Sequence, residues 1–249
     1  MNLEKKDIEY GFWNPKNRNP EYLTFDNDKI YEVKNLGIEF KDEQNTTNEI
    51  KIWNKSLEKL ESVEYIWTYH KLNQTTFESM CRMKNLKGIN IKWSSIKDTE
   101  CLKNLAGLKH LNIGLSTNIQ KIEPICSLPN LITFESENLK NVDDWGFLTN
   151  QVQLEGLGIS GGTYERLKLS SLDFLRNLKN LKYLYLISTN ISNKSLKPIY
   201  NIKGLENLIL TNDWEDEELR KLKQNLPNLK FGSVVQNNQT KYLQRIFRK

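Results

Sequence analysis

A leucine-class residue recurs along this chain at a spacing in the low twenties. The column comprises Val63, Leu86, Leu108, Leu131, Leu154, Leu181, Leu205 and Leu229, with steps of 22 to 24 residues and one step of 27. Further apolar residues follow three and five positions later, as Leu111 and Ile113 follow Leu108. Strand neighbours alternate between two faces, so the pattern predicts one short strand per repeat with an inward apolar side. Repeats this short cannot bury their own core, which predicts a stacked solenoid.

The bulk composition is consistent with a long, narrow core. The 249 residues are 38% hydrophobic, with a mean hydropathy of −0.63. Thirty-six basic and 31 acidic residues give a net charge of +5 that is spread along the chain, which makes nucleic acid an unlikely partner. No apolar run approaches the ~18 residues of a membrane helix, and the start MNLEKKDIEYGFW lacks the apolar block of a signal peptide. We therefore predict a cytoplasmic protein without a membrane partner.

One segment displays the repeat most clearly. It runs LKNLAGLKHLNIGLSTNIQKIEPICSLPNL from Leu102 to Leu131. Here the chain resembles the leucine-rich-repeat family, in particular the short type of roughly 22 residues per repeat that is typified by bacterial internalins. The resemblance covers residues 53–235. It implies an α/β solenoid: a horseshoe or arc with a parallel sheet on its concave side, short helices or irregular turns on its convex side, and caps at both ends.

The regions outside the repeats are candidates for those caps. Residues 1–52 do not fit the repeat and contain a predicted strand from Ile30 to Phe40. The basic residues 236–249 include TKYLQRIFRK, which has the spacing of a capping helix. The stretch DWEDEELRKLKQNL, with Leu219, Leu222 and Leu226 on one side, predicts a convex helix in the last repeat.

The three cysteines are predicted to be small buried hydrophobic residues without a disulfide. Cys81 and Cys126 lie five residues before their column residues but two turns apart, beyond the reach of a disulfide. Cys101 lies seven residues before Leu108 and thus on another part of its turn.

No motif for catalysis, metal binding or cofactor binding is found. The two histidines, His70 and His110, occupy different columns on separated turns. His110 and Glu135 are predicted to project from adjacent strands within hydrogen-bond reach, which on an exposed sheet is usually an ordinary surface pair. We predict a protein that is not an enzyme, with no metal and no cofactor.

The residues two, four and six positions after each column residue form the predicted concave face, which points away from the core and is called the outer face below. Six of these 24 residues are aromatic and only three carry a full charge. Aromatic, charge-poor surface is typical of the centre of a protein interface. The predicted partner-binding residues are Tyr65, Trp67, Tyr69, His110, Glu135, Glu137, Tyr183, Tyr185 and Ile187.

Two alternatives bear on that set. The chain's own N-terminal cap could cover Tyr65, Trp67 and Tyr69. The preferred contacts are Tyr183, Tyr185 and Ile187, which lie beside the loop at 160–166 that makes one repeat longer than the others.

The predicted function is a non-catalytic protein-interaction module. Its concrete form is a bacterial immunity protein that neutralises a toxin domain. An intracellular adaptor or regulatory subunit is the alternative.

Overall fold

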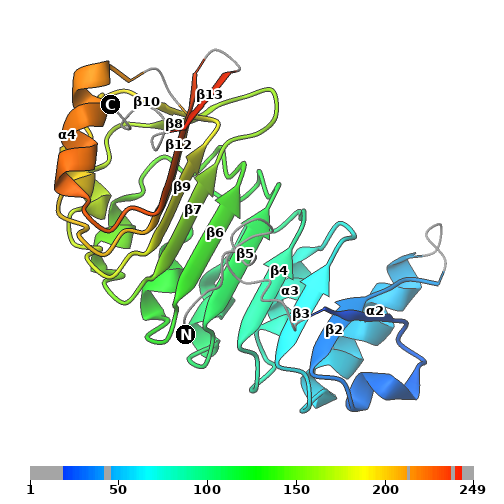
Figure 1. Ribbon diagram of the computed structural model, residues 1–249. Coiled ribbons are helices and arrows are strands. Elements are labelled where there is room, and N and C mark those ends of the chain that lie inside the picture. Colours follow the sequence, from blue (N-terminus) through cyan, green and yellow to red (C-terminus); the bar gives the residue numbers. More distant parts are fainter. Residues whose placement is uncertain (1–18, 42–45, 212–213, 237–238, 243–249) are drawn as a thin grey trace. The chain divides into compact units, whose positions relative to one another are not determined.

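The computed structural model (Figure 1) describes residues 19–41, 46–211, 214–236 and 239–242. The chain divides into two compact units between Glu135 and Ser136, each described by itself below. The predicted α/β solenoid is present in both: each turn supplies one strand to a parallel sheet and returns through a short helix. All eight column residues are followed two positions later by a strand, as the repeat predicts.

The strands of the first unit are neighbours in space in the same order as in the chain. They are β1 (Glu21–Leu23), β2 (Asn35–Ile38), β3 (Tyr65–Thr68), β4 (Gly88–Ile91) and β5 (His110–Gly114). All pair in parallel, with Tyr65 opposite Gly88 and Gly88 opposite His110. Strand β6 (Thr133–Glu137) contains the boundary between the units. Because equivalent positions lie in register, one row of residues on each sheet face represents one column of the sequence.

Helical segments return the chain on the core side of this sheet. They are η1 (Asp28–Tyr31), α2 (Thr46–Ser56), η2 (Leu57–Lys59), α3 (Gln74–Met80), η3 (Glu100–Asn104) and η4 (Glu123–Ser127). The side chain of Asn73 caps α3 by accepting a hydrogen bond from the Thr76 amide at 2.9 Å. Apart from α2 and α3, these segments are 3₁₀ helices of three to five residues.

The second unit continues the same plan with one addition. Its main sheet has the order β7 (Gly156–Ser160), β9 (Tyr183–Ile187), β11 (Asn207–Thr211), β12 (Phe231–Gln236) and β13 (Gln239–Tyr242). A separate parallel pair joins β8 (Leu167–Leu169) to β10 (Thr189–Ile191). The returning segments are η5 (Gly146–Asn150), η6 (Asp173–Leu175), η7 (Lys197–Ile199) and α4 (Asp216–Asn225). The lengthened loop therefore leads into the β8–β10 pair.

The inward residues form the core that the sequence predicts. Seven of the eight column residues, from Val63 to Leu205, are at most 1% exposed, and Leu229 is half-buried. In the seven repeats from Val63 to Leu205, the residues three and five positions later are buried as well, including Leu111 and Ile113 in the first unit and Leu157 and Ile159 in the second. Burying a leucine or isoleucine side chain contributes about 1.5–3 kcal/mol, so these rows are the main source of stability.

Asparagines directly before the column residue add a polar ladder between adjacent turns. The Nδ2 atoms of Asn85, Asn130, Asn180 and Asn228 donate to the backbone carbonyls of Glu61, Ala106, Val152 and Lys203, at 2.8–2.9 Å. Each bond joins one turn to the turn before it. The carbonyls of tight turns have few ladder partners, so a side-chain amide satisfies a group that would otherwise depend on water.

The cysteine prediction is wrong for all three residues. Cys81 is buried as expected, but it forms a disulfide with Cys101, with Cα atoms 5.6 Å apart, and Cys126 is exposed. Cys81 ends the α-helix α3, whereas Cys101 lies in the 3₁₀ helix η3. An α-helix rises about 1.5 Å per residue and a 3₁₀ helix about 2.0 Å, so offsets from the strand column do not carry over to the returning segments.

The two ends differ from the caps predicted. Within 1–52, strands β1 and β2 join the sheet in parallel, and the helix α2 begins at Thr46. At the other end β13 pairs antiparallel with β12, so Gln239–Tyr242 form a strand and not the start of a helix. Antiparallel pairing needs only a short hairpin connection, which explains why so few residues suffice. Residues 1–18 and 243–249 lie outside the described residues.

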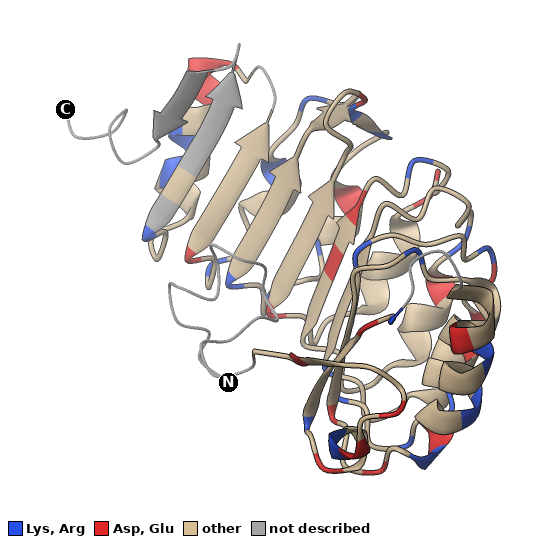
Figure 2. Ribbon diagram, turned by 90° about the vertical axis from the view of Figure 1, so that its right-hand side faces the viewer, with Lys and Arg blue, Asp and Glu red and all other residues tan. Residues whose placement is uncertain are grey.

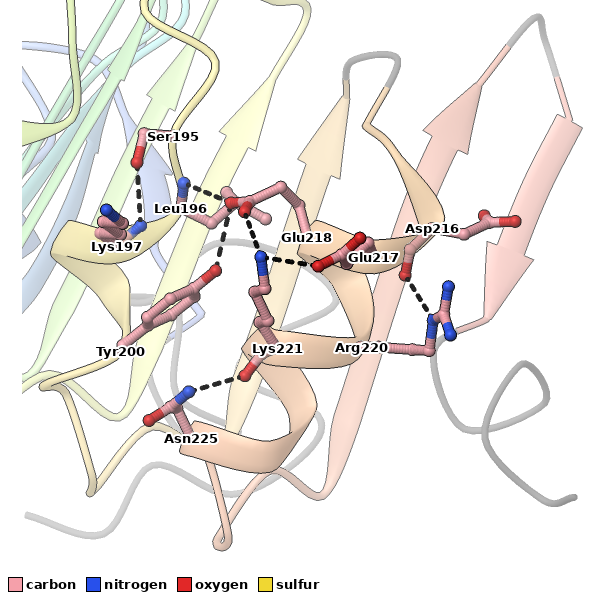
Figure 3. Close-up of polar contacts among 10 residues, drawn as sticks. All are labelled: Ser195, Leu196, Lys197, Tyr200, Asp216, Glu217, Glu218, Arg220, Lys221 and Asn225. Carbon is pink, nitrogen blue, oxygen red and sulfur yellow. Dashed lines mark hydrogen bonds and ion pairs between the residues drawn. The ribbon is translucent and has the colours of Figure 1, made fainter.

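The predicted helix of the last repeat is confirmed as α4, with Leu219 and Leu222 buried. Figure 3 shows that Glu218 connects α4 to the preceding turn. Its Oε2 atom accepts hydrogen bonds from the Leu196 amide at 3.3 Å and from the Tyr200 hydroxyl at 3.1 Å. Burial, followed by the hydrogen bond to Glu218 and the charge of that carboxylate, raises the pKa of Tyr200 to about 12. The returning segments are thus joined by polar contacts as well as by apolar packing.

Candidate functional site

The outer face of the sheet is short of charge in both units. Figure 2, which colours charged residues, shows that they gather at the turns and helices and leave most of the strand length free of them. Among the 24 predicted outer-face positions only Lys92, Glu135 and Glu137 are charged. A sheet face exposed only to water is normally richer in polar and charged residues, so the composition favours contact with another molecule.

In the first unit two aromatic side chains on this face are well exposed. Tyr22 of β1 is 40% exposed and Tyr69, directly after β3, is 53% exposed, with ring centroids 5.5 Å apart. Strand β2 lies between them, and its Gly37 pairs in register with Tyr22 and with Trp67. A Cβ atom at residue 37 would overlap the Tyr22 ring. The glycine therefore lets Tyr22 lean across β2 and meet Tyr69, although their strands are not neighbours.

A carboxylate lies beside this pair. Glu39 follows β2 by one residue; since Ile38 is opposite Thr68, Glu39 comes next to Tyr69 on the same face. Burial, contact with Tyr69 and the charge of Glu39 together raise the pKa of Tyr22 well above its usual value. Within the described part of the chain, the carboxylate of the half-buried Glu39 forms no ion pair or hydrogen bond, while its backbone carbonyl accepts from Trp53 Nε1 at 3.3 Å. We call Tyr22, Glu39 and Tyr69 the edge cluster.

One charge near the edge cluster, that of Lys41, is already paired. Lys41 forms an ion pair with Asp26 and lies 5.6 Å from the centroid of the Phe25 ring. The hydrogen bond from Lys41, followed by one from Thr24, lowers the pKa of Asp26. Lys41 is thus matched by Asp26, while Lys92, the residue after β4, comes next to Tyr69 on the side away from Glu39.

Two predicted residues of the same unit are less accessible than a contact surface requires. Tyr65 is 7% exposed and Trp67 only 2%. The rings lie side by side with centroids 6.4 Å apart, and Tyr65 also lies 6.4 Å from the His110 ring. A role for either ring in binding stays a prediction. The alternative, that the N-terminal cap covers these rings, involves in part residues 1–18, which lie outside the described residues.

The predicted His110–Glu135 pair is not formed. His110 is fully buried, and its Nδ1 lies 2.9 Å from the Thr133 hydroxyl. Glu135 instead accepts a hydrogen bond from Asn112 Nδ2 at 3.0 Å. The cause is the register: Glu135 is four residues after its column residue and His110 only two, so Glu135 lies opposite Asn112. Glu135 and Glu137, both half-buried, share the outer face of β6.

In the second unit, the exposure of the predicted contact residues differs along one strand. Tyr183 and Tyr185 of β9 are 3% and 5% exposed, whereas Ile187 is 37% exposed. In register, Tyr183 lies between Gly156 and Asn207. Both tyrosines are therefore buried on this face. A role for them in binding stays a prediction.

The loop lengthened at 160–166 is held close to β9 and β10 at its base. The Gly161 amide donates to the Ile187 carbonyl at 2.8 Å, and a side chain at residue 161 would collide with the Ser188 carbonyl. Ser188 in turn donates from its hydroxyl to the Gly162 carbonyl at 2.8 Å. Tyr164 at the tip is fully exposed. The loop adds a separate exposed aromatic ring to this unit.

Tyr22 and Glu39 are members of the edge cluster that the column pattern missed. They belong to β1 and to the residue after β2, which the repeat count left in the cap. A signal was present: Ile30–Phe40 was predicted as a strand, and alternation within it places Gly37 and Glu39 on the face opposite Leu36 and Ile38. What could not be predicted was the parallel pairing that brings this strand beside β3.

The described residues offer no other constellation for chemistry. Across 19–41, 46–211, 214–236 and 239–242, no group of three or more His, Cys, Asp or Glu residues is arranged to hold a metal ion. In the same ranges no helix is long and apolar enough to cross a membrane. The edge cluster, two aromatic rings and a carboxylate at the surface, is suited to non-covalent recognition.

Comparison with known proteins identifies similar folds. An internalin C2 from Listeria monocytogenes matches with 15% sequence identity and a TM-score of 0.53, over 72% of this chain and 74% of that one. An internalin, InlF, from the same organism matches with 25% identity and a TM-score of 0.53, over 73% of this chain and 49% of that one. The match thus spans about half the length of the second protein. No protein-family model and no curated protein sequence matches the chain.

Proposed function

Since this chain is a leucine-rich-repeat protein in fold and sequence pattern, we propose that it binds another protein through the outer face of its sheet. The observation that carries this proposal is the edge cluster: Tyr22 and Tyr69 expose about half of their side chains on a face otherwise short of charge. Tyrosines give large contact area with a polar tip, and they are enriched where proteins bind each other. The cluster is already assembled, so binding requires little ordering.

Other classes of function have less support. A groove that tracks phosphates needs several Lys and Arg residues, and Lys92 is the single basic residue among the 24 outer-face positions. A metalloenzyme needs a cluster of metal ligands, and among the described residues no group of three or more His, Cys, Asp or Glu residues is arranged to hold a metal ion. Binding without chemistry remains the function that fits the residues of this face.

Within this class we propose a stoichiometric binder that acts in the cytoplasm as a bacterial immunity protein and masks a toxin domain. An adaptor or regulatory subunit is the second form of the same proposal. Co-expression distinguishes them: an immunity protein must protect cells from the toxin domain encoded next to it. A neighbouring toxin-domain gene with no protection on co-expression would favour the adaptor form.

The test of the binding surface compares two equally exposed tyrosines. The partner is isolated from the native host, and its affinity is measured for the wild type, Tyr69→Ser and Tyr31→Ser. Tyr31 is 51% exposed but lies in η1, away from the sheet. We expect a submicromolar complex that weakens at least about tenfold in Tyr69→Ser and not in Tyr31→Ser. Equal affinities for all three proteins would contradict the proposal.

A further inference from the structure

We propose that the edge cluster is a receptor for an arginine side chain of the partner protein. The inference rests on the proposed function and specifies its chemistry. Two tyrosine rings whose centroids are 5.5 Å apart adjoin a carboxylate that has no ion pair within the described residues. A cation is attracted by the faces of aromatic rings and by the carboxylate at the same time.

The fold prepares this arrangement before any ligand arrives. Gly37 leaves the space that Tyr22 fills when it leans across β2, and the parallel register brings Glu39 beside Tyr69. The three side chains therefore come from three consecutive elements of the sheet: β1, the end of β2 and the end of β3. A site assembled on strands loses little conformational entropy on binding.

The carboxylate of Glu39 selects a cation. The nearby Lys41 is paired with Asp26 and is therefore not available to neutralise Glu39. Glu39 is half-buried, so its charge is screened less than that of a fully exposed carboxylate. A neutral or anionic partner group would leave this charge facing an interface without compensation, which is unfavourable.

Arginine fits better than lysine. Its guanidinium is planar, stacks on aromatic rings, and presents several N–H donors that match a carboxylate. Lysine is a more strongly hydrated point charge that gains less from the rings. The cluster offers both kinds of contact within one small area of surface.

The test uses short peptides and the full chain, and it does not require the native partner. Probes are acetyl-Gly-Arg-Gly-amide, its citrulline analogue, which has the same shape without the charge, and its lysine analogue. Binding is followed by NMR shifts of ¹³C-labelled tyrosine rings, assigned through Tyr22→Phe and Tyr69→Phe. We expect weak, saturable binding, about tenfold tighter for arginine than for citrulline and weaker for lysine than for arginine.

Two matched variants isolate the carboxylate. Glu39→Gln should reduce the preference for arginine over citrulline to about twofold, because it removes the charge and keeps the shape. Glu32→Gln, which changes the net charge equally at an exposed position in the turn before β2, should leave the preference unchanged. Equal binding of arginine and citrulline, or an unchanged preference in Glu39→Gln, would overturn the proposal. Equal binding of arginine and lysine would overturn the assignment to arginine.

The two proposals can fail separately. If the native partner loses affinity for Tyr69→Ser but the wild type shows no preference for the arginine peptide, the outer face binds a protein through other chemistry. If the arginine preference is found but no partner distinguishes Tyr69→Ser from Tyr31→Ser, the cluster binds a cation and the interface lies elsewhere.

Discussion

The sequence predicts the environment of the side chains on the core-facing side of the sheet, called the inner row, better than that of the side chains on the outer face. On the inner row, residue type and position agree: Leu111 and Leu157 are apolar, in register and fully buried. On the outer face, similar residue types have opposite environments, since Tyr69 is half-exposed while Tyr183 is buried. Periodicity therefore determines which face a side chain occupies, whereas its exposure depends on the neighbours that each strand brings to it.

The largest expected effect lies on the inner row. Leu111→Ala removes a fully buried side chain from a closely packed core and should lower the free energy of unfolding by about 3 kcal/mol. Asn90→Ala, a half-buried position on the outer face of the neighbouring strand, should change it by less than about 0.5 kcal/mol. Urea unfolding of both variants measures the contrast. Similar losses of unfolding free energy in both variants would show that the two faces contribute equally to stability.

A somewhat smaller effect is expected where the returning segments are linked covalently. The Cys81–Cys101 disulfide closes a loop with a sequence separation of 20 residues. Replacing both cysteines with serine should lower the free energy of unfolding by about 2 kcal/mol, because the unfolded chain gains conformational freedom. Cys126→Ser, at an exposed position, is the control and should be neutral. A thiol titration that finds three free thiols in the native protein would refute the disulfide.

The next smaller effect on stability is expected for the asparagine ladder. Asn130→Ala loses the bond from its side-chain amide to the Ala106 carbonyl and should cost about 1 kcal/mol. Asn150→Ala, at an exposed position in η5, should cost less. Chemical denaturation at one pH compares the two. If the two variants lost equal stability, the hydrogen bonds of the ladder would contribute no more than hydrogen bonds to water.

The smallest effect is a dependence on pH at the last helix. The folded chain holds the Tyr200 proton more tightly than the unfolded chain, whose tyrosine pKa is near 10.0. The contribution is therefore complete below pH 10 and is lost as the pH rises through about 12. Over that range the wild type should lose more stability than Tyr200→Phe, by less than about 1 kcal/mol after screening by solvent. Parallel pH profiles of the two proteins would contradict this linkage.

The sequence was sufficient to predict the repeat fold, the strands of all eight repeats and the inward residues. These follow from one local rule, the alternation of side chains along a strand, applied at a constant period. The same register, followed more closely, would have paired Glu135 with Asn112 in place of His110. The asparagine ladder was also visible, since Asn precedes Leu at four of the eight column positions.

Other features depend on contacts that no periodic rule describes. The edge cluster needs β1 and β2 to pair in parallel with β3, and it needs Gly37 to leave room for the Tyr22 ring. The disulfide depends on the different rise of α3 and η3. The burial of Tyr183 and Tyr185 could not be inferred from their position on the outer face. Because both are buried, substituting them would combine lost stability with any lost contact, so Tyr69 is the better probe of binding.

Site-specific photo-crosslinking tests the central claim most directly. The photoreactive residue p-benzoylphenylalanine replaces either Tyr69, on the outer face, or Tyr31, which is equally exposed outside the sheet. The complex with the native partner is then irradiated and analysed by mass. Binding through the outer face predicts a covalent adduct with the partner from position 69 and none from position 31. An adduct from position 31 alone would place the interface off the sheet and contradict the account.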